Sequence, residues 1–170
     1  MILGREYFSA PATALAPDLI GKILCRRTET GEIIRAKIVE TECYFGEEDT
    51  ACHAHKGKTE RTKPMYEAGG ITYVYLCYGI HSLLNIVTGE AGHPEAVLIR
   101  GIEGAVGPGR ATKFLEITLK DNALPLSEDS GIWIEDDGSK SPKIQCTARV
   151  GIDYASKRDR ERKWRFITKK

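Results

Sequence analysis

Long apolar stretches are missing from this sequence of 170 residues, which nowhere approaches the roughly 18 consecutive apolar residues of a membrane span. Residues 1–11 carry no cationic start followed by an apolar run, so we expect no secretory signal. The five cysteines are an odd number at irregular spacing, which indicates reduced thiols rather than a disulfide framework. The sequence therefore predicts an intracellular protein without a membrane partner, in the cytoplasm or nucleoid of a bacterium or the nucleus of a eukaryote.

Internal repeats and domain boundaries are also absent. A chain of this length corresponds to one domain with one core. The composition, 41% hydrophobic and 29% charged, is that of an ordinary globular protein and excludes a disordered or fibrous one. We predict a single domain over residues 1–170.

A large net charge is missing as well, because 25 Lys and Arg face 24 Asp and Glu. The charges are nevertheless unevenly distributed. Residues 157–170 hold eight basic side chains against two acidic ones, a balance of +6 that leaves −5 for the first 156 residues. Residues 56–63 form a second basic stretch, and residues 121–137 hold six acids and no base. Each run could be a solvated tail or helix face, so charge alone does not identify a partner.

Alternating apolar residues and turn signals predict an α+β fold, a mostly antiparallel curved sheet built from hairpins with a few peripheral helices. Residues 43–70 read as one long polar loop that includes a helical turn, a length that is typical of functional segments. The expected helices cover residues 12–20 and 110–119, and the expected strands cover residues 22–27, 33–42, 71–77, 83–88, 96–102, 132–135, 147–152 and 164–168.

Known metal and phosphate motifs are incomplete. His93-Pro94-Glu95 has the H-x-E form of a zinc deaminase, but only Cys146 follows where P-C-x-x-C is needed. Four possible zinc ligands have a spacing that matches no familiar zinc site, namely Cys43, Cys52, His53 and His55. The glycine-rich segment 104–112 lacks the Gly-Lys-Ser/Thr end of a phosphate loop. We expect no metal and no cofactor.

Aromatic residues are concentrated in one region, since six of the 13 lie between Tyr44 and Tyr78. Tyr73 and Tyr75 share a strand face by the two-residue period, where tyrosines can simply fill a sheet surface. Tyr78 sits beside Gly79 at the predicted hairpin turn, where its ring buries little within its own domain. It is therefore a candidate wedge for another molecule.

Glu42 ends the predicted strand 33–42, where the polar loop begins. A carboxylate at a strand end is commonly solvated or a cap. Beside an aromatic pocket it could instead act as a general base. The candidate pocket residues are Tyr44, His53, Tyr75, Asn85 and Arg100.

Six ordered blocks carry these residues, and together they resemble the alkyladenine (3-methyladenine) DNA glycosylase family. The resemblance covers nearly the whole chain, in the family's order. The blocks are residues 38–44, 48–53, 73–79, 85–86, 97–100 and 148–151.

The resemblance implies a protein that binds duplex DNA, inserts Tyr78 into the minor groove and flips one nucleotide into an aromatic pocket. Tyr44 and Tyr75 would stack on the flipped purine, and His53 would hydrogen-bond it with the Ala51 backbone nearby. An electron-rich sandwich favours cationic alkylated purines.

By the same resemblance, Glu42 would be the general base on a water that attacks C1′, and Arg100 and the Val150 carbonyl would help to place that water. Asn85 would reject normal guanine by a clash with its exocyclic amine. The resemblance thus implies a monofunctional DNA glycosylase for alkylated or deaminated purines, a monomer that leaves an abasic site in base excision repair. The basic segments 157–170 and 56–63 would then lie on the side of Tyr78, with residues 121–137 turned away.

Two other classes of function stay open. A non-catalytic module could use the basic segments and exposed tyrosines to bind damaged or single-stranded DNA. An enzyme acting on a small molecule could use the same aromatic pocket, and it would show no salt-dependent affinity for DNA.

Overall fold

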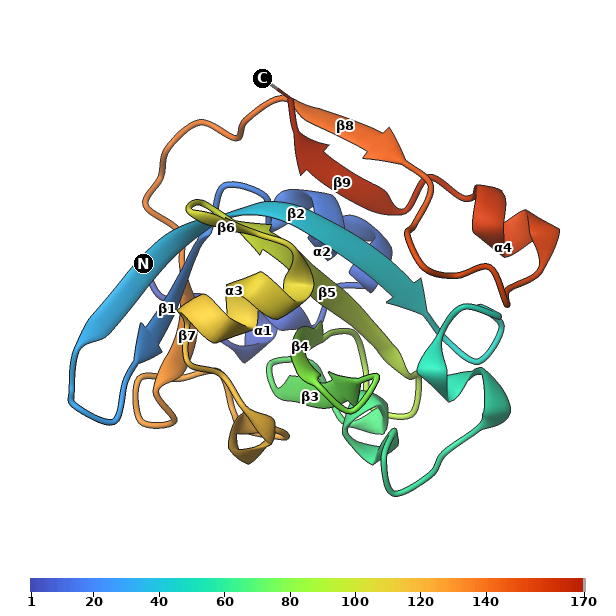
Figure 1. The fold of residues 1–170 in the computed structure, drawn as a ribbon, viewed down its shortest axis with the longest axis horizontal. Coiled ribbons are helices and arrows are strands. Elements are labelled where there is room, and N and C mark those ends of the chain that lie inside the picture. Colours follow the sequence, from blue (N-terminus) through green and yellow to red (C-terminus); the bar gives the residue numbers. More distant parts are fainter. Residues whose placement is uncertain (170) are drawn as a thin grey trace.

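The computed structural model describes residues 1–169 and has an α+β fold built on a curled antiparallel sheet (Figure 1). The sheet order is β3-β4-β5-β2-β1-β7, with β6 on β5 and β9 between β2 and β8. The strands are β1 Ile23–Arg27, β2 Ile33–Phe45, β3 Thr72–Cys77, β4 His81–Val87, β5 Glu95–Ile102, β6 Ala105–Val106, β7 Ile132–Glu135, β8 Ile144–Thr147 and β9 Arg165–Thr168. The helices are α1 Arg5–Phe8, α2 Ala12–Asp18, α3 Pro108–Phe114 and α4 Lys157–Glu161, with 3₁₀ turns η1 His53–Lys56, η2 Lys63–Tyr66 and η3 Leu119–Asp121.

The long strand β2 organises the molecule. Its first half pairs with β1, and its second half pairs with β5 on one side and β9 on the other. The register with β5 shifts on both sides of Glu40, which marks a β-bulge. A bulge bends a strand, and the end of β2 carries Glu42 and Tyr44 into a cavity that residues of the β3–β4 hairpin also line.

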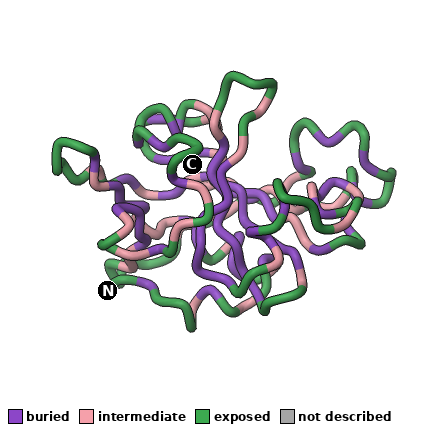
Figure 2. Tube along the Cα trace, turned by 90° about the horizontal axis from the view of Figure 1, so that it is seen from below, coloured by how far each residue is buried: buried purple, intermediate pink, exposed green. Residues whose placement is uncertain are grey.

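The core lies between the sheet and the helices. Helix α2 packs on β2 and β5, and α3 packs on β4 and β5. The largest core cluster joins apolar residues of α1 and α2 to the central strands, among them Phe8, Leu19, Ile38, Ile86 and Ile102. Figure 2 shows buried backbone running through the central strands, while the exposed segments are loops around them. The α+β class and the curved antiparallel sheet are thus confirmed.

The strand expected over residues 147–152 is wrong. β8 ends at Thr147, and the chain then leaves the sheet. Polar contacts draw these residues away from the sheet. The buried side chain of Arg149 donates to Cys43 and Asp49, and the Val150 amide donates to Glu42 instead of to a neighbouring strand. A positive φ at Gly151 accompanies the turn.

Two further expectations differ in extent. Helix α3 ends at Phe114 rather than near residue 119, because Glu116 adopts a left-handed φ of 53° and its carbonyl accepts from Arg26. The expected loop 43–70 begins later, because β2 continues to Phe45, and it holds two 3₁₀ turns, η1 and η2, where one helical turn was expected.

The terminal basic run is folded rather than a free tail through residue 169. It forms α4 and β9, and the buried carboxylate of Asp159 pairs with both Arg158 and Arg162. The acidic run is largely paired too, through Asp121 with Arg26, Glu135 with Arg35, Asp136 with Lys22 and Asp137 with Lys37. In Figure 1, α4 and the loop 56–63 lie on the side away from β7. Their placement on a DNA-facing side with Tyr78 stays a prediction.

No helix within residues 1–169 has the length and apolar character needed to cross a membrane.

Candidate active site

A cavity of about 940 Å³ opens between the end of β2, the β3–β4 hairpin, the start of α3 and the loop 150–154. It gathers residues that lie far apart in the sequence. Eight of the nine sequence-predicted site residues line it, namely Glu42, Tyr44, His53, Tyr75, Tyr78, Asn85, Arg100 and Val150.

Glu42 is the one acidic residue among the described residues that line this cavity, and its side chain is 0% exposed. Both of its oxygens accept a hydrogen bond. The Tyr44 hydroxyl donates to Oε1 at 2.8 Å, and the Val150 backbone amide donates to Oε2 at 2.7 Å. Arg100 Nε lies 3.9 Å from Oε2. The carboxylate is therefore held in one orientation by groups from β2, β5 and the loop after β8.

Burial raises the pKa of Glu42, and the positive charge of Arg100 and the hydrogen bonds from Val150 and Tyr44 offset this only in part. The carboxylate is thus a better proton acceptor than an exposed glutamate. Among ionisable groups in a cavity, a carboxylate with a raised pKa is a candidate general base.

The side chain of Val150 is exposed, and its amide rather than its carbonyl contacts Glu42. The sequence-based role of the carbonyl in placing a water stays a prediction. What the geometry adds is a donor that fixes the carboxylate itself.

Arg100 is itself positioned by a second acid, Glu40. The Arg100 Nε lies 3.2 Å from Glu40 Oε1, and Arg165 Nε donates to the same oxygen at 2.6 Å. Sequence reasoning missed Glu40 as a site residue. The two-residue period of a strand was the available signal, since it puts Glu40, Glu42 and Tyr44 on one face.

Aromatic rings form another part of the cavity wall. The rings of Tyr73 and Tyr75 are 5.5 Å apart, and the His53 ring meets Tyr75 edge-on at 4.4 Å. His53 Nδ1 lies 3.2 Å from the Tyr73 hydroxyl. Burial and the nearby Arg61 lower the pKa of His53 to about 4, so the imidazole is neutral at pH 7. A neutral ring with Nδ1 engaged keeps Nε2 for a ligand.

Tyr44 and Asn85 are oriented by the protein. One face of the Tyr44 ring is covered by Arg149, whose Cζ lies 5.0 Å from the centroid, which leaves the other face for a ligand. The buried Asn85 donates from Nδ2 to the Tyr73 carbonyl at 3.2 Å. Its amide oxygen stays available as an acceptor at the cavity wall.

Ala51 is the one predicted residue outside the cavity lining. Its amide donates to Asp49, and its carbonyl accepts from the hydroxyl of Tyr154 at 2.7 Å. Tyr154 and Arg61 line the cavity instead, and sequence reasoning missed both. Arg61 lies over the Tyr75 ring at 5.3 Å. Neither lies in a recognisable motif, so no sequence signal assigned them.

Tyr78 stands at the tip of the β3–β4 hairpin and is 93% exposed. Tyr78 and Gly79 have φ values of 52° and 68°, and the Ile80 amide closes the turn on the Cys77 carbonyl. Two consecutive positive φ values are those of a type I′ hairpin turn. A left-handed tyrosine costs about 1–2 kcal/mol, and the ring gains no burial in return. Folding alone does not explain a tyrosine at this position.

Within residues 1–169, His, Cys, Asp and Glu form no group of three or more that could hold a metal ion. All five cysteines are free, and Cys43 and Cys52 are buried. Burial raises the pKa of both thiols, so they behave as packing residues.

Comparison with known proteins identifies the family of this chain. A family model described as "Methylpurine-DNA glycosylase (MPG)" matches residues 6–106 and 103–170. A protein of Psychrobacter cryohalolentis is 43% identical over 91% of this chain and 86% of its own length. One of Borrelia garinii is 40% identical over 98% and 96%, and one of Methanocella arvoryzae is 39% identical over 99% and 92%. All three carry the name "Putative 3-methyladenine DNA glycosylase". The chain belongs to the methylpurine-DNA glycosylase family.

Proposed function

We propose that this protein is a monofunctional DNA glycosylase that flips alkylated or deaminated purines out of duplex DNA and hydrolyses their N-glycosidic bonds. The observation that carries the proposal is the buried Glu42 carboxylate, fixed on both oxygens, in a tyrosine-lined cavity beside an exposed hairpin tip. The names of the relatives support the same chemistry.

Base flipping is the role proposed for the Tyr78 hairpin. Taking one nucleotide out of the stack costs a few kcal/mol, least for a damaged base, and leaves a gap in the duplex. The exposed rings and alkyl groups of Tyr78 and Ile80 supply an apolar wedge for that gap. Because Tyr78 also lines the cavity, the wedge and the pocket are adjacent.

Recognition of the flipped base would use the aromatic walls. A purine between Tyr44 and Tyr75 gains stacking, and a cationic alkylated purine gains a further cation–π interaction of about 0.5–2 kcal/mol. His53 is neutral at pH 7 and therefore does not repel such a cation. Asn85 would discriminate at the purine edge.

The proposed chemical step is addition of water to the sugar. As the bond from C1′ to the purine nitrogen breaks, its electron pair leaves with the base and the sugar takes on oxocarbenium character. Glu42 accepts a proton from the attacking water, whose oxygen bonds to C1′ and gives an abasic site. Arg100 would orient that water. No lysine nucleophile takes part, so the DNA strand stays intact.

The test is release of free purine from a methylated duplex by the purified protein. The proposal expects free base, an intact strand and affinity for DNA that falls steeply with salt. Tight binding without release would instead establish the non-catalytic module. An absence of salt-dependent affinity for DNA would favour a small-molecule enzyme.

A further inference from the structure

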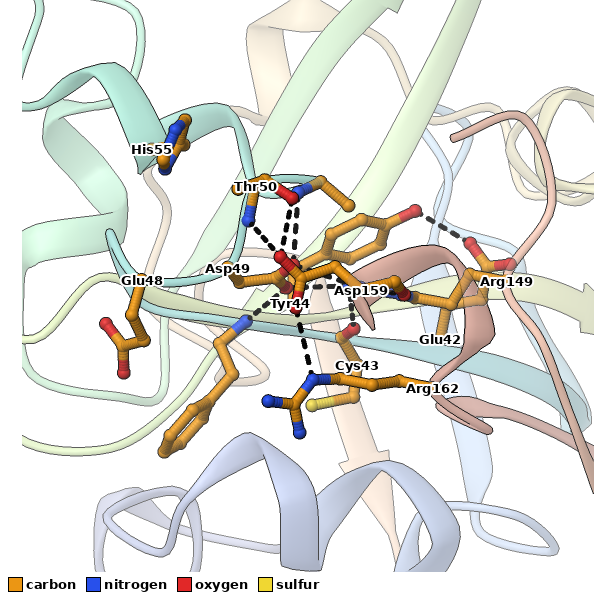
Figure 3. A network of polar contacts seen from close by, with 12 residues as sticks. Glu42, Cys43, Tyr44, Glu48, Asp49, Thr50, His55, Arg149, Asp159 and Arg162 are labelled. Carbon is orange, nitrogen blue, oxygen red and sulfur yellow. Dashed lines mark hydrogen bonds and ion pairs between the residues drawn. The ribbon is translucent and has the colours of Figure 1, made fainter. Parts of the chain in front are cut away.

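Arg149 is buried next to the proposed base yet does not contact it. Its side chain is 0% exposed, and the Asp49 carboxylate accepts two hydrogen bonds from it, at 2.6 Å and 3.0 Å. It also donates to the carbonyls of Cys43 at 2.9 Å and Asp159 at 3.2 Å. Figure 3 shows this network around the end of β2. Arg149 therefore ties together β2, the loop after it and α4.

Stability alone accounts poorly for this arrangement. A buried ion pair often contributes little net stability, because desolvation of both charges offsets their attraction. Among residues 1–169, Arg149 and Arg26 are the two residues with a buried Nε that lacks any hydrogen-bond partner. A buried charge that is left incompletely satisfied suggests a gain in placement rather than in stability.

Arg149 lies next to both groups that donate a hydrogen bond to Glu42. Its guanidinium lies over the Tyr44 ring at 5.0 Å, and the Tyr44 hydroxyl donates to Glu42 Oε1. Its own backbone continues directly into Val150, whose amide donates to Glu42 Oε2. The Cys43 carbonyl that it binds lies between Glu42 and Tyr44 in β2. Arg149 thus contacts Tyr44 and directly precedes Val150, the two residues that donate to Glu42.

We propose that Arg149 is the positioning residue of the site, which aligns Tyr44 and Val150 so that the Glu42 carboxylate is oriented and ionised for its reaction. This inference rests on the proposed function, in which Glu42 is the base. Arg149 touches neither water nor substrate in this role.

The chain offers a matched control. Arg26 is also buried, pairs with both oxygens of Asp121 at 2.9 Å and 3.2 Å, and has the same unpartnered Nε, but its partners are Asp121 and the Glu116 carbonyl rather than groups at the end of β2. Arg149→Lys and Arg26→Lys keep the charge and lose the planar two-point contact. Both variants should lower the melting temperature. The two variants should differ in their effect on Glu42 only if Arg149 positions that carboxylate.

The experiment measures single-turnover base release against pH for both variants with a single-lesion duplex. Arg149→Lys should lower the rate constant by about 10-fold to 100-fold, the range expected when a reacting group is misplaced. The acid limb of its pH–rate profile should move to higher pH. Weaker hydrogen bonds from Val150 and Tyr44 would leave the pKa of Glu42 higher in this variant than in the wild type. Arg26→Lys should keep the wild-type profile. Equal rates and equal profiles for the two variants would overturn the proposal.

A second readout is independent of turnover. In protein labelled with ¹³C at glutamate carboxyls, the Glu42 resonance is assigned by its loss in Glu42→Gln. Its titration should move to higher pH in Arg149→Lys and stay in place in Arg26→Lys. If the wild type releases no base, the proposed function fails, while this titration still decides the placement role. Should Arg149→Lys not fold, Asp49→Glu keeps both charges of the pair but displaces the same contact, and it must shift the Glu42 titration in the same direction; an unchanged titration contradicts the inference.

Discussion

Replacing Glu42 by glutamine removes the proposed base while keeping its shape. The side-chain oxygen of the glutamine can accept a hydrogen bond from the backbone N–H of Val150, which can only donate. The amide nitrogen can then donate to the Tyr44 oxygen, because a phenol hydroxyl both donates and accepts. Glutamine can therefore keep a hydrogen bond to each of the two partners, which lie 2.7 Å and 2.8 Å from the carboxylate in the wild type. The variant should fold and keep its affinity for damaged duplex.

Stability should not fall with this substitution. Folding raises the pKa of Glu42, so its ionised form is disfavoured in the folded protein. The wild type is consequently stabilised below the unfolded pKa, and this stabilisation is lost as pH rises through the folded pKa. At pH 7, Glu42→Gln should melt at or above the wild-type temperature, with a difference that shrinks toward low pH.

Catalysis should fall by about 10²-fold to 10⁴-fold, the usual contribution of a general base and about 2.7–5.4 kcal/mol of activation free energy. The assay is single-turnover release from a duplex with one hypoxanthine or one 7-methylguanine, beside a binding titration. The control is Glu32→Gln, at an exposed glutamate in the β1–β2 turn just before β2 begins, and it should release base at the wild-type rate. Release by Glu42→Gln within a few fold of wild type would refute the assignment.

The other predictions concern the tip and the aromatic walls. Tyr78→Asn should keep or raise the melting temperature, since asparagine tolerates a left-handed φ. It should weaken lesion binding by about 5-fold to 150-fold, as loss of a stacking contact of about 1–3 kcal/mol predicts, and unchanged binding would exclude the wedge. Arg61→Gln removes a cation over Tyr75 and should raise release of 7-methylguanine relative to hypoxanthine by about 2-fold to 5-fold; an unchanged ratio contradicts this. His53 has a folded pKa of about 4, below its unfolded value of 6.5, so its stabilisation is complete above pH 6.5 and lost as pH falls through 4; urea unfolding of His53→Gln should lack this dependence in that window.

The hairpins were predictable because their signals are local. β1, β3, β5 and β7 each begin or end within one residue of the expected bounds, since alternating apolar residues and turn glycines define them. The path of residues 148–152 was not predictable from such patterns. It depends on the buried Arg149, whose partners Asp49 and Asp159 are 100 and 10 residues away in sequence.

The site likewise contains contacts that local sequence predicts and contacts that it does not. The motif residues Glu42 and Tyr44 meet through the strand period alone, which is a local property. Tyr154 reaches the cavity through the loop after Gly151, and Arg61 reaches it over the Tyr75 ring. These contacts join segments whose relative placement only tertiary packing determines. Eight of the nine motif residues line one cavity, and their roles stay predictions.

The most direct test of the central claim is the fate of water oxygen during turnover. A duplex with one alkylated purine is incubated with the wild-type protein in H₂¹⁸O, and the free base and the abasic strand are analysed by mass spectrometry, with reduction at once to prevent exchange. The account predicts free purine, an uncut strand and ¹⁸O at C1′. No released base, or a strand cut with an enzyme adduct trapped on reduction, would contradict it.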